Sequence, residues 1–174
     1  QLFWFDRDGS RRAAVGPAGS YRQVALSPSG RQAAVSRRDP VTGNLDVHVL
    51  DLATGVLSRQ TSDPAYDSDP VWAPDERTLI IGSNRTTWSR PFRKDLVTGA
   101  ERPVIPREAR NLWLDDWTRD GQFLVLRRGD GKSSQVYVAP ATGAVTPRLL
   151  RSVRAITDQY HVSPAGNRIG FGTK

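Results

Sequence analysis

Two short acidic clusters and two histidines are the residues of this chain whose chemistry could support catalysis or metal binding. The clusters are Asp67-Ser68-Asp69 and Asp115-Asp116, and the histidines are His48 and His161. Neighbouring carboxylates can bind a cation or divide acid and base roles between them. A calcium ion, however, takes at least about six oxygen ligands, and neither cluster offers that many. We therefore expect these carboxylates to cap turns or to pair with arginines.

The sequence carries none of the common catalytic signatures. Neither histidine stands in a His-Glu-x-x-His or similar metal-ligand spacing, and no Gly-x-Ser-x-Gly turn supplies a serine nucleophile. Phosphate-binding loops and protein-kinase motifs are missing as well, and the chain has no cysteine. We therefore expect no catalytic residue, no metal and no cofactor. His48 alternates with valines as an outer-strand residue does, whereas His161 lies in a predicted inner strand and is a candidate for lining a channel.

The chain is strongly basic, with a net charge of +7 and an isoelectric point of about 10.5. Arginine supplies most of this charge, with 22 residues against 3 lysines. A basic balance can serve nucleic acid, an anionic surface or acidic ligands. The arginines are spread over the whole chain, so we expect surface ion pairs and no nucleic-acid partner. No apolar run reaches the roughly 18 residues of a membrane span, so no membrane insertion is expected.

The elements that position these residues are indicated by a hairpin signature that recurs four times. Its copies are residues 26–30, 72–76, 117–121 and 162–166, and their last residues are separated by 46, 45 and 45 positions. A second turn marker ends at Gly9, Gly55, Gly99 and Gly143, with separations of 46, 44 and 44. Two independent turn signals on one period of about 45 residues predict a propeller or a related array of strands.

Within each period, short apolar runs alternate with turn residues, which predicts four antiparallel strands and no helix. The complete units are residues 21–61, 65–105 and 111–150. Residues 1–16 match the outer half of a unit, and residues 157–174 match the inner half. The predicted fold class is therefore all-β, a β-propeller of four-stranded antiparallel blades with three full blades and two half-blades.

The hairpin signature is explained by turn chemistry. Proline presets the backbone of the second turn position, and glycine accepts the left-handed conformation that follows. Two copies depart from this pattern, because Glu76 replaces the glycine and Arg119 replaces the proline. We expect a strained left-handed backbone at Glu76. Both hairpins should still form, because their flanking strands are strongly apolar.

The two half-blades allow two arrangements. They could pair with each other and close a four-bladed ring, or the chain could be a slice of a larger propeller. Propellers have about four to eight blades. We expect the slice, because four-bladed rings are the rarest kind of propeller. The chain also has no methionine, not even an initiator, and this favours an excised piece of a longer protein.

The repeat resembles that of TolB-type, WD-repeat-like propellers. Residues 69–75 read Asp-Pro-Val-Trp-Ala-Pro-Asp, and residues 79–85 end in Ser-Asn-Arg. The outer hairpins at residues 51–55 and 95–99 read Asp-Leu-x-Thr-Gly, and residues 2–9 are similar to hairpins in propellers attached to bacterial serine/threonine kinases. Only the second unit has the complete Ser-Asn-Arg string, so we interpret it as a strand-end turn and not as a repeated ligand site.

This resemblance implies a non-catalytic scaffold that binds a protein, a peptide or a small ligand. The implied parent is a bacterial signalling protein, with a serine/threonine kinase as leading candidate and the propeller as its sensor domain. The alternatives are a TolB-like envelope accessory protein and the propeller of a prolyl-oligopeptidase-type peptidase. The resemblance favours an extracytoplasmic location.

The predicted binding surface is the rim at which the innermost strands begin. Alignment on the hairpin signature places Arg22, Ser68, Trp113 and Asp158 at equivalent positions, and a mixed set of this kind suits ligand recognition. The other tryptophans are expected as wedges between blades, where their large area would join neighbouring sheets. They are Trp4, Trp72, Trp88 and Trp117.

Overall fold

The computed structural model describes residues 1–86, 89–106, 112–129, 132–142, 146–154, 157–163 and 165–173. These residues form sixteen β-strands and their connections, without a helix. The strands are arranged in three four-stranded and two two-stranded sheets, and all neighbouring strands are antiparallel. The predicted all-β class is confirmed.

Each four-stranded sheet is a meander in which consecutive strands pair. The first hairpin and the first sheet are β1 (Leu2–Phe5), β2 (Arg11–Val15), β3 (Ser20–Leu26), β4 (Gln32–Arg38), β5 (Leu45–Asp51) and β6 (Leu57–Arg59). The second sheet is β7 (Asp67–Trp72), β8 (Thr78–Ser83), β9 (Arg90–Asp95) and β10 (Glu101–Pro103). The third sheet and the last hairpin are β11 (Trp113–Trp117), β12 (Phe123–Gly129), β13 (Ser134–Pro140), β14 (Arg148–Val153), β15 (Thr157–Val162) and β16 (Ile169–Thr173). Strand β14 runs past residue 150, the predicted end of the third unit.

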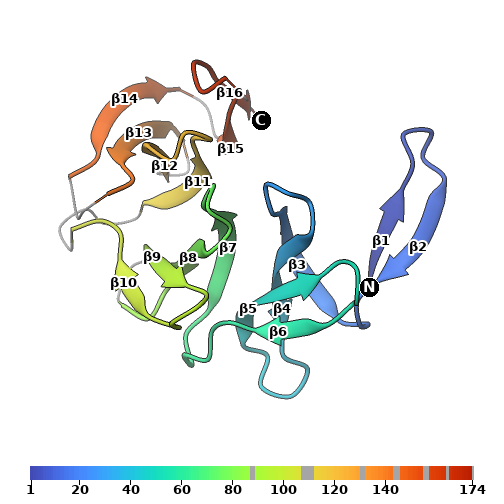
Figure 1. Ribbon diagram of the computed structural model, residues 1–174. Coiled ribbons are helices and arrows are strands. Elements are labelled where there is room, and N and C mark those ends of the chain that lie inside the picture. Colours follow the sequence, from blue (N-terminus) through green and yellow to red (C-terminus); the bar gives the residue numbers. More distant parts are fainter. Residues whose placement is uncertain are drawn as a thin grey trace.

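The sheets follow one another along an arc, as Figure 1 shows. The first strand of each sheet packs beside the first strand of the next, so that β3, β7, β11 and β15 lie on the inside of the arc. This is the blade arrangement of a β-propeller. The terminal hairpins β1–β2 and β15–β16 form separate sheets and do not pair with each other. The structure therefore has the open form of the two arrangements that the sequence allowed.

Apolar clusters fill each junction between sheets. Trp72 packs with Ala34 and Val47 of the first sheet, and its indole Nε1 donates a 3.0 Å hydrogen bond to the carbonyl oxygen of Ala25. Trp117 packs with Ala73 of the second sheet. These two tryptophans are wedges between blades, as predicted.

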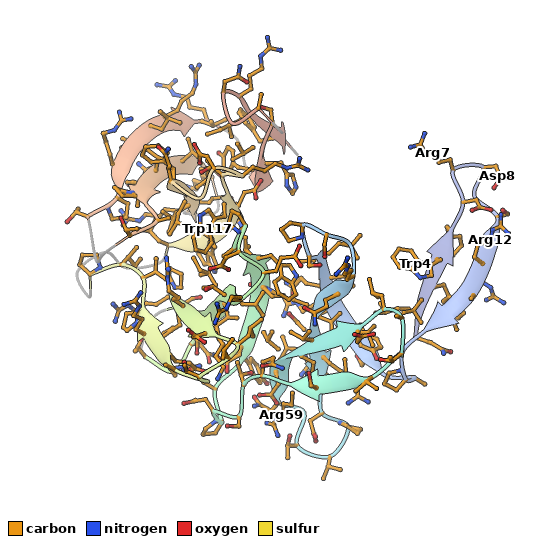
Figure 2. The ribbon with its side chains drawn as sticks, viewed as in Figure 1. Trp4, Arg7, Asp8, Arg12, Arg59 and Trp117 are labelled. Atoms are coloured by element: carbon orange, nitrogen blue, oxygen red, sulfur yellow. The ribbon has the colours of Figure 1, made fainter. Side chains whose placement is uncertain are left out.

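The same prediction is wrong for Trp4. Trp4 lies on the first hairpin with 42% of its surface exposed, and it belongs to none of the apolar clusters of the described residues. Figure 2 shows it on this hairpin, apart from Trp117. Leu2 and Val15 are the residues of the hairpin that pack against the first sheet. Trp88 lies outside the described residues.

The hairpin after β7 has the strained backbone that its sequence predicted. Glu76 adopts a left-handed conformation with φ of 54°, where the other copies have glycine. Its carboxylate accepts hydrogen bonds from the backbone nitrogen of Ser29 and, at 2.8 Å, from the Ser29 hydroxyl. The strained residue therefore binds the hairpin of one sheet to the equivalent hairpin of the next.

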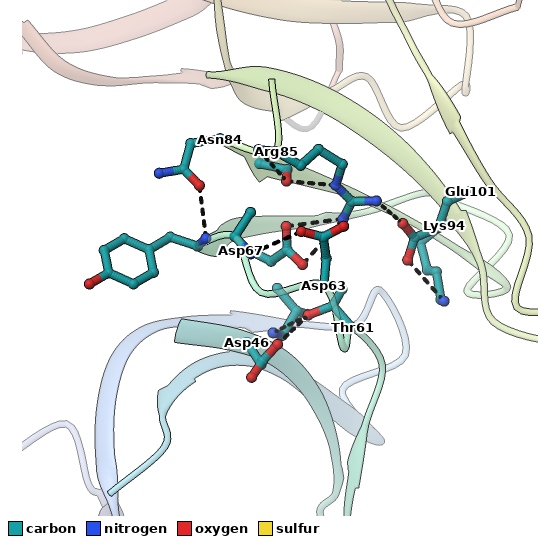
Figure 3. Close-up of polar contacts among 12 residues, drawn as sticks. Asp46, Thr61, Asp63, Asp67, Asn84, Arg85, Lys94 and Glu101 are labelled. Atoms are coloured by element: carbon teal, nitrogen blue, oxygen red, sulfur yellow. Dashed lines mark hydrogen bonds and ion pairs between the residues drawn. The ribbon is translucent and has the colours of Figure 1, made fainter. Parts of the chain in front are cut away.

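The Ser-Asn-Arg string belongs to a polar network inside the second sheet, shown in Figure 3. Arg85 forms an ion pair with the buried Asp67 at 3.1 Å and a second with Glu101, which also pairs with Lys94 at 3.0 Å. The Asn84 side chain accepts a 2.8 Å hydrogen bond from the backbone of Tyr66. The interpretation of this string as a bonded strand-end turn is confirmed.

Substitution of Trp72 tests the junction between the first two sheets. We expect Trp72→Phe to lower the free energy of unfolding by about 1 kcal/mol, because the hydrogen bond to Ala25 is lost. Trp72→Ala should cost about 3–5 kcal/mol, because it also leaves a cavity. Urea unfolding measures both values. Trp4→Ala is the matched control and should cost much less than Trp72→Ala; equal costs would contradict the assignment of Trp72 as a wedge.

Candidate functional site

An open groove of about 800 Å³ runs along the inner strands. Its walls come from β3, β7, β11 and β15 and from the hairpins that follow the first three of these strands. In a propeller this position corresponds to the central channel, towards which the innermost strands face. The groove combines apolar side chains with a few charged ones, which is the usual composition of a ligand site.

Each inner strand carries a β-bulge. The pairing of β3, β7, β11 and β15 with the second strand of its sheet shifts register once, with one extra residue on the inner strand. A bulge bends its strand and re-aims the side chains beside it. The bulges therefore decide which residues of the inner strands face the groove.

The bulge in β7 places Asp69 at the groove with an uncommon backbone. Its φ is 51°, in the left-handed region, and Pro70 follows it, although a proline disfavours helical conformations in the residue before it. The Asp69 carboxylate accepts hydrogen bonds from the Gln23 side chain of the first sheet and, at 2.8 Å, from the Ser68 hydroxyl. These bonds hold the strained residue and tie β7 to β3.

One wall of the groove is apolar and accessible. Val24 and Leu26 of β3 line it and are 50% and 51% exposed. Pro70 and Leu114, which are both buried, line the groove from the next two sheets. A partner that covers these side chains gains about 25 cal/mol for each Å² of apolar surface removed from water.

Asp115 is a buried carboxylate beside the groove. It forms an ion pair with Arg127, whose Nε lies 3.1 Å from Oδ2. Burial raises the pKa of Asp115 to about 6, because removal from water disfavours the charged form, and Arg127 offsets only part of this effect. Nearby Asp69 raises the pKa further by charge repulsion.

Asp116 joins the third sheet to the last hairpin. Its Oδ2 accepts a 2.7 Å hydrogen bond from the backbone nitrogen of Val162, and its Oδ1 accepts one of 2.7 Å from the nitrogen of Trp117. His161 lines the groove, as its position in an inner strand predicted, and its Nδ1 lies 4.0 Å from Asp116 Oδ2. His48 is in β5, where its Nδ1 lies 3.3 Å from the carbonyl oxygen of Asp46.

The predicted pairing of the acidic clusters with arginines is confirmed for one residue of each cluster, and the other residue has a different role. Asp67 and Asp115 pair with arginines, and Asp69 and Asp116 bind groups of neighbouring sheets. Within the described ranges, no group of three or more histidine, cysteine, aspartate or glutamate side chains could hold a metal ion. The same ranges contain no helix of the length and apolarity needed to cross a bilayer.

Three of the four predicted rim residues directly precede a groove-lining residue in the chain. Arg22 is exposed on β3, Ser68 is partly buried on β7, and Trp113 begins β11 with the Arg127 guanidinium 5.5 Å from its ring centre. Asp158 lies in β15, and its side chain is outside the described part of the chain. A ligand role for these four residues stays a prediction.

The groove is lined instead by residues that follow these positions along the same strands. Gln23, Val24 and Leu26 were not predicted as lining residues, because an alignment of the entry positions on the hairpin signature contains no information on the bulges. The one local signal for such an irregularity was the Asp69-Pro70 pair, since proline cannot donate a ladder hydrogen bond.

No known family model matches the chain. Among solved structures, it is similar to a TolB candidate from Agrobacterium tumefaciens, with a TM-score of 0.79, 19% identity, and coverage of 94% of this chain and 58% of that one. TolB from Acinetobacter baumannii gives a TM-score of 0.74 and 21% identity, over 94% of this chain and 40% of that one. A prolyl endopeptidase structure gives a TM-score of 0.66 and 20% identity, over 92% of this chain and 27% of that one.

These similarities establish a TolB-like β-propeller fold. The identities are too low to carry more than the fold, and the same fold occurs in TolB and in an endopeptidase. The chain spans between two fifths and three fifths of the length of the two TolB structures. The activity and partners of a whole protein containing it are therefore matters for proposal.

The raised pKa of Asp115 predicts how stability changes with pH. In the folded chain the pKa is about 6, above the value of 3.8 for an unperturbed aspartate, so the folded state binds the proton more tightly. As pH falls from 7 to 5, wild type should gain about 1 kcal/mol in unfolding free energy relative to Asp115→Asn. Urea unfolding at several pH values measures this difference.

The matched control for this pH series is Asp51→Asn. Hydrogen bonds from the backbone and hydroxyl of Thr54 hold the pKa of Asp51 below its ordinary value, so this group stays ionised between pH 5 and 7. The unfolding free energy of this variant should run parallel to that of wild type. A parallel course for Asp115→Asn as well would show that Asp115 does not titrate in this range.

Proposed function

We propose that this chain is a non-catalytic propeller scaffold that binds an extended segment of a partner protein in the groove. The observation that carries the proposal is the accessible apolar wall of Val24 and Leu26. Exposed apolar side chains often mark interaction sites, and ligand sites are usually concave. Asp69 and His161 supply polar groups in the same groove, which can orient a bound segment.

The groove is suited to binding because its walls are already fixed. Bonds between neighbouring sheets, from Gln23 to Asp69 and from Trp72 to Ala25, hold β3 against β7. Asp116 holds β15 against β11 in the same way. A preorganised site pays less conformational entropy on binding, so more of the contact energy appears as affinity.

The chain would serve as the sensor or interaction domain of a larger extracytoplasmic signalling protein of bacteria, such as a serine/threonine kinase. The partial coverage of the TolB structures supports a larger parent, and the outer-strand hairpin at residues 2–9 carries the kinase resemblance. In this role the groove binds the signal-bearing protein, peptide or small ligand, and the rigid blades transmit its presence.

Two alternatives each have an observation in their favour. The likeness to TolB structures favours an envelope accessory protein that works by protein contact. The likeness to a prolyl endopeptidase favours the propeller of a peptidase. The flanking sequence separates them, because a kinase catalytic loop, a signal peptide and a nucleophile turn each identify one parent.

Peptide selection tests the groove directly. Peptides are selected from a random library on the immobilised chain, and their affinities are measured for wild type and for the double variant Val24→Ser/Leu26→Ser. We expect a loss of about tenfold or more, about 1.4 kcal/mol, because the apolar wall is removed. Val41→Ser/Val97→Ser changes exposed outer-turn valines and is the control. Selected peptides that bind all three proteins equally would refute binding in the groove.

A further inference from the structure

The outer strand of the third sheet differs from its counterparts. Strand β14 has six residues, whereas β6 and β10 have three each. It pairs with β13 on one side, and no described strand lies on its other side. Figure 1 shows it at the outer edge of the arc. A long free edge presents unpaired backbone donors and acceptors to a partner strand.

The side chains of β14 add an unusual surface to this edge. Leu149 and Leu150 are 46% and 47% exposed, next to each other. Arg148 and Arg151 flank them and are exposed, and exposed Arg154 follows the strand. No acidic residue occurs in β14 or in the neighbouring β13. The exposed side chains of this edge are therefore two leucines between arginines in the sequence.

Each of the other two outer strands carries a charged residue that forms an ion pair within its own sheet. In the first sheet, Arg59 of β6, labelled in Figure 2, pairs with Asp46 at 2.7 Å. In the second sheet, Glu101 of β10 pairs with Arg85 and Lys94.

The arginines on and directly after β14 have no such partner. Across the described ranges, Arg148, Arg151 and Arg154 have neither an ion pair nor a side-chain hydrogen bond. We propose that the β14 edge binds an extended acidic segment of a partner protein. The carboxylates of that segment pair with the arginines, its apolar side chains cover Leu149 and Leu150, and its backbone bonds to the free edge.

The charges of β14 also select among the strands that could pair with its edge. Edge strands commonly carry positive charges that prevent random pairing, and β14 carries Arg148 and Arg151. A second copy of this edge would bring like charges together, which is unfavourable. An acidic strand, in contrast, is attracted by the same arginines. The inference is independent of the groove, which lies on the inner side of the sheets.

A fluorescent eight-residue peptide of alternating glutamate and leucine is the probe, and the same peptide with lysine in place of glutamate is its control. Fluorescence anisotropy at physiological salt measures the affinity of each for the full chain. We expect saturable binding of the acidic peptide and about tenfold or weaker binding of the basic one. Absence of saturable binding by the acidic peptide would overturn the proposal.

Charge-reversal variants then locate the binding. We expect Arg148→Glu/Arg151→Glu to weaken binding of the acidic peptide at least about tenfold. Arg31→Glu/Arg102→Glu changes the net charge by the same amount at exposed positions elsewhere and should retain the wild-type affinity. Equal losses in the two variants would mean a non-specific charge effect and would overturn the proposal.

Two further measurements keep the test decisive. If the reversal variant does not fold, Arg148→Gln/Arg151→Gln replaces it and should still lose affinity relative to Arg31→Gln/Arg102→Gln. Hydrogen exchange with the acidic peptide bound should slow for amides of residues 148–153. Protection confined to other strands would place the peptide elsewhere and would contradict the assignment.

Discussion

The architecture depends on contacts between residues one repeat apart. Hydrogen bonds between sheets join Gln23 to Asp69, Trp72 to Ala25 and Asp116 to Val162, over 46 or 47 positions of the chain. This separation is about one sequence period. Apolar clusters lie at these two junctions and at the junction between the second and third sheets. Because contacts one repeat apart recur along the chain, successive sheets turn about a common axis and the inner strands converge.

The groove is a consequence of this convergence. The bonds that cross a junction use groups on the inner strands, so the same contacts that hold the sheets together also fix the groove walls. Asp69 is an example, because a hydrogen bond from Gln23 of the neighbouring sheet stabilises its strained backbone. Strained residues persist only where their surroundings hold them. The polar groups of the groove are therefore positioned before any partner arrives.

Much of the fold was predictable because repeated turn chemistry and strand periodicity are local properties. The strained backbone at Glu76 followed from one missing glycine, and the roles of Trp72 and Trp117 followed from the large apolar area of the tryptophan side chain. The lining of the groove was not predictable in this way, because a bulge depends on pairing between strands. The exposure of Trp4 depends on which sheets surround its hairpin, and a local pattern does not contain that information.

If neighbouring sheets are blades of one propeller, β3 and β7 must meet side by side at the inner edges of their sheets. Nuclear Overhauser effects in a labelled sample detect this contact through the indole Nε1 proton of Trp72. We expect cross-peaks from this proton to Ala25, across the junction between the sheets. Cross-peaks to residues of its own sheet alone, or contacts typical of two sheets stacked face to face, would exclude the propeller arrangement.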